Sequence, residues 1–234
     1  MKVDSIKALT AEFVEYKSSH KAPSVYWEML DYFRSSWDLN AAPEELKTIF
    51  NDSIHSTQDR SLWKRERYQP KKMMGLFFQN YPDFCKQAFR ELFDMTLDLE
   101  VRVDRFKFYS DQLLNFYKKD HPTSIENNHY QDTEIIGLYL FLFDPKENPL
   151  YQLDWFRTIC NLTDAKPIPE THDIARFYKI ARILKKFLQQ ESTLCNIYEK
   201  EATKLRLNFC KPMDSFLPLA DFCAYCDLKF NTIK

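Results

Sequence analysis

The stretch 129–159, HYQDTEIIGLYLFLFDPKENPLYQLDWFRTI, decides the fold class of this chain. It joins a polar helix start to an apolar core, and an aromatic turn with two prolines follows. By periodicity alone, the apolar run 138–143 also fits a buried strand, but its polar lead-in favours a helix over 131–143. We therefore expect two helices here, 131–143 and 153–162, joined by a proline-containing turn.

Helical periodicity continues on both sides of this stretch, and alternating strand patterns are scarce. Only two glycines occur in 234 residues, which suits helices better than a sheet with many tight hairpins. The chain is 44% hydrophobic and 16% aromatic, which is ample for a sizeable core. We predict a mainly α, globular bundle of about eight to ten helices with little or no sheet. Further helices are expected from residue 3, after Pro23, from Pro43, from near Lys71, after Pro82, near 101–116, over 170–190, over 191–207, and over 214–230 with an early interruption at Pro218.

The polar stretch 118–130 is the expected internal boundary of the chain. We predict an N-terminal helical region over 1–120 and a C-terminal helical region over 121–234 packed with it. The alternative is one single domain over 1–234.

The two isolated glycines and the charge balance exclude several classes of protein. Phosphate-cradling loops, dinucleotide-binding turns and nucleophile elbows need glycines at fixed spacing, and Gly75 and Gly137 stand alone. The formal net charge of -1 gives no global basic footprint for nucleic acid. The N-terminus lacks an apolar signal core, and no apolar run approaches the roughly 18 residues that span a bilayer. We expect a cytoplasmic protein that does not enter the membrane.

The six cysteines are scattered, and reduced thiols are the default expectation. Cys223 and Cys226 have the C-x-x-C spacing of zinc and redox sites, and Cys210 is near them in sequence. No histidine follows His172, so the local ligand set is incomplete and buried thiols are the simpler interpretation. We predict no metal and no cofactor.

The five histidines are isolated, and the most interesting candidate for acid-base chemistry is the group of His129, Asp132 and Glu134. A polar helix start explains the same three residues, because carboxylates are favoured in a first turn. We therefore predict no catalytic residues, and an enzyme with a dispersed site near His129 remains an alternative.

Two basic clusters are candidate nucleic-acid-binding surfaces. The first cluster mixes cations with aromatic rings, which suits phosphate contacts combined with stacking. The second cluster runs along one side of a helix whose other side is apolar, and a solvated helix face is its alternative interpretation. The first cluster consists of Arg60, Trp63, Lys64, Arg65, Arg67, Tyr68, Lys71 and Lys72, and the second of Arg176, Lys179, Arg182, Lys185 and Lys186.

Three sequence blocks carry a family resemblance. They are YWEMLDYF at 26–33 with WDL at 37–39, FRELFD at 89–94 with LEVRV at 99–103, and QDTEIIGLYL at 131–140 with FDPK at 143–146 and LY at 150–151. In this order they resemble the helical N-terminal module that precedes the AAA+ motor in McrB-like restriction proteins. The chain departs from the family pattern at Glu134 and Ile135, where Arg and Thr are usual, and at Gln152, where Lys is usual.

The resemblance implies a non-catalytic recognition module of a restriction or defence system, here without the motor. Its expected partners are DNA, an AAA+ motor or another defence protein. The alternative from a different class is a protein-interaction module or adaptor without nucleic-acid binding, which the near-zero net charge favours.

Overall fold

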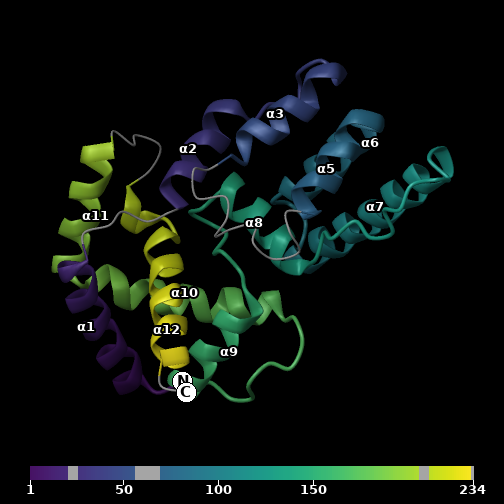
Figure 1. Ribbon diagram of the computed structural model, residues 1–234. Coiled ribbons are helices and arrows are strands. Elements are labelled where there is room, and N and C mark those ends of the chain that lie inside the picture. Colours follow the sequence, from purple (N-terminus) through teal and green to yellow (C-terminus); the bar gives the residue numbers. More distant parts are fainter. Residues whose placement is uncertain (21–25, 56–68, 206–210, 233–234) are drawn as a thin grey trace. The chain divides into compact units, whose positions relative to one another are not determined.

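The computed structural model describes residues 1–20, 26–55, 69–205 and 211–232. In these ranges the chain forms eleven α-helices and two short 3-10 helices, and it contains no strand (Figure 1). The predicted all-helical class is confirmed, with one helix more than the upper end of the expected range.

The chain divides into two compact units. The first unit comprises Met1–Trp27 and Asp144–Lys234, and the second comprises Glu28–Phe143. The polar stretch 118–130, at which we expected a boundary, lies inside the second unit, where it forms the end of one helix and most of the loop to the next. The first unit contains α1 (Val3–Ser19), the first two residues of α2 (Tyr26–Ser36), α9 (Leu153–Leu162), α10 (Ile174–Gln190), α11 (Ser192–Leu205), η3 (Pro212–Asp214) and α12 (Leu217–Thr232). The second unit contains the rest of α2, η1 (Pro43–Glu45), α3 (Leu46–Ser53), α5 (Gln69–Asn80), α6 (Pro82–Phe93), α7 (Leu99–Asp120) and α8 (Thr133–Phe143).

Helix α12 forms the centre of the first unit, where it contacts α1, α9 and α10. Phe222 of α12 and Phe13 of α1 are both buried and meet edge to face at 5.4 Å. We expected Pro218 to interrupt α12, but it lies in the first turn of this helix. Backbone N–H groups of a first turn make no hydrogen bond within the helix, so a proline, which has no N–H, is tolerated there. Both ends of the chain therefore contribute to one core.

The second unit packs around aromatic rings from α3, α5, α6, α7 and α8. Phe89 of α6 is fully buried and contacts Phe78, Phe106 and Tyr139 at centroid distances of 5.5, 5.0 and 5.2 Å. Such ring pairs stabilise a core beyond their buried area. The helix pattern over 131–143 is confirmed as α8, which is buried over most of its length.

Side-chain caps fix the start of α8 and of α10. The carboxylate of Asp132 accepts the backbone N–H groups of Glu134 and Ile135, and that of Asp173 accepts the N–H of Arg176 at 2.9 Å. A cap of this kind satisfies backbone donors that have no partner inside the helix. These caps explain why a polar lead-in marks the beginning of α8 and of α10.

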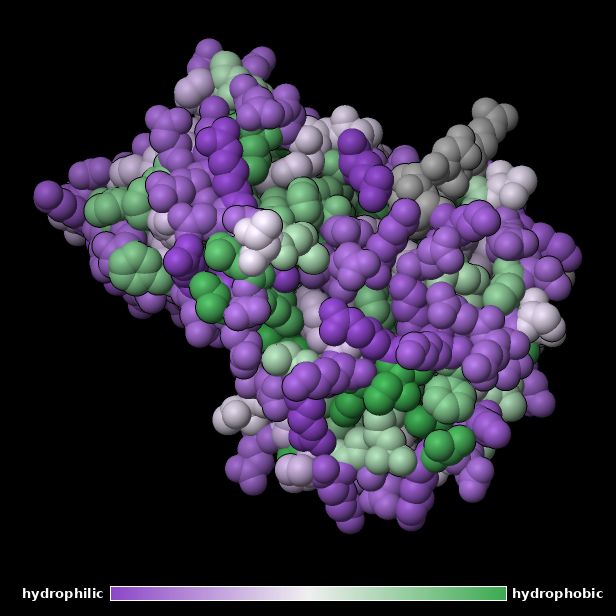
Figure 2. All heavy atoms as spheres, turned by 180° about the vertical axis from the view of Figure 1, so that it is seen from behind, coloured by the Kyte–Doolittle hydropathy of each residue, from purple (hydrophilic) through white to green (hydrophobic). Residues whose placement is uncertain are grey.

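One face of the chain carries a mixture of hydrophobic and hydrophilic side chains. Hydrophobic side chains gather in patches between hydrophilic ones on the face shown in Figure 2. Among the described residues, no helix is both long enough and apolar enough to cross a membrane.

Candidate functional site

The second basic cluster lies on α10, and the structure separates its five cations into two groups. Ile174, Phe177, Ala181, Leu184 and Leu188 form the buried side of the helix. Arg176 and Lys185 lie at the edges of that buried side and are half-buried, whereas the other three cations are exposed.

Arg176 is engaged by the protein itself. Its guanidinium donates to the carbonyl oxygen of Ala165 at 2.8 Å and lies over the ring of Phe156 at 5.5 Å. These contacts tie the loop after α9 to the beginning of α10. A structural role therefore accounts for this cation.

Lys185 is engaged in the same way. Its ammonium group donates to the carbonyl oxygens of Asp214 at 2.5 Å and Lys146 at 3.3 Å, and it lies 4.3 Å from the ring centroid of Phe216. It thus holds two loops of the first unit against α10. The α10 cations available to a ligand are the other three.

Lys179, Arg182 and Lys186 form what we call the basic face of α10. Their spacing of three and four residues puts all three on one side of the helix, over an axial length of about 10 Å. Helix α10 contains no carboxylate side chain, since Asp173 and Glu191 only flank it. The basic face therefore has no acidic neighbour on its own helix to neutralise it.

The first basic cluster lies mostly outside the described residues, where Arg60, Trp63, Lys64, Arg65, Arg67 and Tyr68 are found. Lys71 and Lys72, its two described members, belong to the first turn of α5. Lys71 donates to the carbonyl oxygen of Ile54 at 3.4 Å, and Lys72 forms an ion pair with Glu126. For these two residues the structure shows contacts within the second unit.

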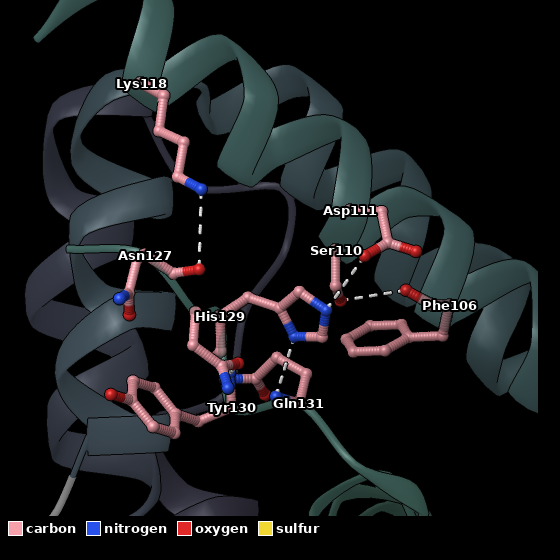
Figure 3. Close-up of polar contacts among 9 residues, drawn as sticks. Phe106, Ser110, Asp111, Lys118, Asn127, His129, Tyr130 and Gln131 are labelled. Atoms are coloured by element: carbon pink, nitrogen blue, oxygen red, sulfur yellow. Dashed lines mark hydrogen bonds and ion pairs between the residues drawn. The ribbon is translucent and has the colours of Figure 1, made fainter. Parts of the chain in front are cut away.

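His129, the histidine of the predicted acid-base group, connects α7 to the loop before α8 (Figure 3). The Nε2 atom of His129 lies 3.2 Å from the carboxylate of Asp111, and its Nδ1 atom lies 2.8 Å from the backbone nitrogen of Gln131. A backbone N–H is only a donor, so Nδ1 of His129 accepts this hydrogen bond. The ring proton is therefore on Nε2, which faces Asp111. Tyr130 between them has a φ of 58°, a left-handed conformation that these local contacts support.

This arrangement does not fit a general base, because protein groups occupy both ring nitrogens of His129. Burial lowers the pKa of His129, an effect that the carboxylate of Asp111 opposes. Asp132 of the predicted acid-base group serves as the cap of α8. Both residues therefore have structural roles: His129 positions the loop before α8, and Asp132 caps the start of α8.

Gln131 is a buried residue that links α5 to α8, a role that the sequence did not predict. Its amide nitrogen donates to the carbonyl oxygens of Pro70 and His129, and its amide oxygen accepts the hydroxyl of Tyr139 at 2.9 Å. We call His129, Gln131 and Tyr139, with the carbonyl oxygen of Pro70, the Gln131 network. It joins α5, the loop before α8 and α8 itself without a formal charge in its buried part.

A charged cluster inside the first unit was also missed. The ammonium group of Lys17 lies 3.3 Å from a carboxylate oxygen of Glu201 and 3.4 Å from one of Asp221. These three side chains, which we call the Lys17 triad, are only 5%, 12% and 14% exposed. The hydroxyl of Tyr198 also donates to Asp221 at 2.7 Å. The sequence signal was weak, since one lysine on an amphipathic helix is normally solvated.

The cysteines of the C-x-x-C spacing are buried within α12. Burial raises the pKa of the Cys226 thiol to about 12, and it raises that of the Cys223 thiol as well. Cys210 lies outside the described residues. The described part of the chain brings no three His, Cys, Asp or Glu side chains together as metal ligands.

Comparisons of the chain with protein-family models, with curated proteins and with solved structures gave no match.

Proposed function

We propose that this chain is a non-catalytic recognition module that binds DNA through the basic face of α10. The observation that carries the proposal is the exposure of Lys179, Arg182 and Lys186 on one side of a helix that contains no carboxylate. Cations presented in this way attract the phosphate backbone and release its condensed counterions.

The geometry supports phosphate contacts more than base readout. Lysine and arginine contacts to phosphates position a protein on a duplex, whereas sequence is read by side chains that reach base edges. The basic face is a row of three cations along about two turns of helix. We propose that it supplies affinity and orientation on the DNA.

The resemblance to the McrB-like module supplies the biological setting of the proposal. In that setting the chain belongs to a restriction or defence system and acts together with an AAA+ motor. Its role is to hold DNA while the chemistry is done elsewhere.

The binding proposal is tested by titrating the full chain into a fluorescently labelled DNA duplex at low salt. Fluorescence anisotropy reports the affinity. The variant Lys179→Gln/Arg182→Gln/Lys186→Gln keeps a polar side chain at each position and removes all three charges. We expect it to weaken binding by at least about tenfold.

A matched control is Lys200→Gln, which removes an exposed cation from α11 of the same unit. We expect its affinity for the DNA to stay within about twofold of that of the unchanged protein, because the loss of one positive charge away from the binding surface has only a small long-range effect. An absence of binding by the unchanged protein at low salt contradicts the proposed function. Equal affinity of the triple variant and the unchanged protein contradicts the assignment to α10.

A further inference from the structure

Helix α7 of the second unit exposes apolar side chains along one stripe. Val101, Phe108 and Phe116 are 40%, 59% and 38% exposed. Spacings of seven and eight residues put them on the same side of the helix, opposite the buried Val103 and Phe106. Arg105 and Gln112 lie between them on the same side, so apolar and polar residues alternate along the stripe. Exposed apolar residues that recur on one side of a helix mark an interaction surface.

Two rings at the beginning of α6, from its N-cap residue Tyr81 and from Phe84, hold the C-terminal end of the stripe in place. Phe116 contacts Phe84 at 5.3 Å and Tyr81 at 5.9 Å between ring centroids. The hydroxyl of Tyr81 in turn donates to Asp120 at 2.7 Å. A ring that is already ordered loses little conformational entropy when a partner covers it.

The stripe is self-complementary when it is read in opposite directions. An antiparallel copy whose centre lies between Phe108 and Tyr109 puts Val101 opposite Phe116 and Arg105 opposite Gln112. The same register puts Asp98, at the beginning of the helix, opposite Lys119 near its end. Asp98 and Lys119 are both exposed. Val101 thus meets Phe116 of the copy, Phe108 lies beside its own copy near the centre, and each end of the helix meets the opposite charge.

We infer that α7 is a self-association surface, on which a second copy of this chain packs antiparallel through Val101, Phe108 and Phe116. A two-fold axis passes near Phe108 and makes the interface isologous. The match between the two halves of the stripe identifies the occupant, because a different protein requires no such symmetry in the α7 sequence. The two ion pairs between Asp98 and Lys119 fix the register more than they add affinity.

Sedimentation equilibrium of the full chain from micromolar to millimolar concentration tests the inference. We expect a monomer–dimer equilibrium, and we expect Phe108→Glu to raise the dissociation constant at least about tenfold. Ile168→Glu places the same charge on an exposed apolar residue of the first unit, so its equilibrium should match that of the unchanged protein. A chain that stays monomeric throughout, or equal effects of the two variants, overturns the inference.

A charge exchange tests the antiparallel register. Asp98→Lys alone and Lys119→Asp alone each place like charges together at both ends of the dimer, so each should weaken it. The double variant restores opposite charges and should recover the dimer. Both changes also oppose the dipole of α7. If they acted only by destabilising the helix, the double variant would form the weakest dimer. Circular dichroism confirms that each variant is folded, and a double variant weaker than both single variants overturns the register.

Discussion

The two units bury polar side chains in opposite ways. The Lys17 triad of the first unit joins α1, α11 and α12 through one cation and two carboxylates. The Gln131 network of the second unit joins α5 and α8 through an amide, a hydroxyl and a neutral imidazole. Buried charges are stable only when every partner is present, whereas neutral groups need only their hydrogen bonds. The first unit should therefore be more sensitive to the loss of one polar residue.

The largest expected effect is that of Lys17→Met. This change leaves two nearly buried carboxylates without their cation, and breaking a buried ion pair in this way lowers the free energy of unfolding by about 3–5 kcal/mol. Denaturant unfolding measures the loss, and amide hydrogen exchange assigns it to α11 and α12.

The matched control is Lys7→Met, which removes an exposed lysine from the same helix. It should change the free energy of unfolding by no more than about 0.5 kcal/mol. Adding Glu201→Gln and Asp221→Asn to Lys17→Met should recover part of the stability. Equal losses for Lys17→Met and Lys7→Met would show that the triad is not coupled in the folded chain.

The second effect is that of Gln131→Leu in the neutral network. The change leaves the hydroxyl of Tyr139 and the carbonyl oxygen of Pro70 without their partner, which lowers the free energy of unfolding by about 2 kcal/mol. Tyr139→Phe removes only one of these hydrogen bonds and should lower it by about 1 kcal/mol. Denaturant unfolding compares them, and a larger loss for Tyr139→Phe would be inconsistent with Gln131 as the centre of the network.

A smaller effect is the pH dependence contributed by Glu201. Burial raises the pKa of its carboxyl above the ordinary value of 4.5, more than the nearby Lys17 lowers it. The folded state then holds this proton more tightly than the unfolded state, so stability falls as pH rises from about 4.5 through the raised pKa. Thermal unfolding across this range should show a weaker decline in Glu201→Gln. An unchanged profile in that variant would remove Glu201 as its source.

The smallest effect is the pH dependence contributed by His129, and its sign is opposite. Burial lowers the pKa of His129 below 6.5, so the unfolded state binds a proton that the folded state rejects. Stability is therefore lost as pH falls from about 6.5 through the lowered pKa. His129→Asn keeps an acceptor for the N–H of Gln131 but cannot titrate, so its stability should be flatter over this range. A slope that persists in His129→Asn must come from another group.

Periodicity predicted the helices because it reflects burial on one side of each element. The pattern over 131–143 and the caps Asp132 and Asp173 are local, and the sequence contains all of the information that they need. The Lys17 triad was not predictable, because its carboxylates come from the other end of the chain.

The composition of the first unit depends on the same kind of long-range packing. It combines both ends of the chain, whereas sequence reasoning expected a division near residue 120. The basic cluster of α10 shows most clearly which contacts a sequence pattern does not predict. Its amphipathic pattern was visible, but the carbonyl acceptors of Arg176 and Lys185 come from loops whose positions no spacing reveals.

A comparison of salt dependence tests directly our proposal that the basic face of α10 contacts DNA phosphates. The measurement is the slope of the logarithm of the binding constant against the logarithm of salt concentration, for the unchanged chain and for Lys179→Gln/Arg182→Gln/Lys186→Gln. Each phosphate contact contributes about 0.9 to this slope, so the variant should be shallower by about 2.7. Two parallel lines would contradict the claim, because the three cations would then release no counterions.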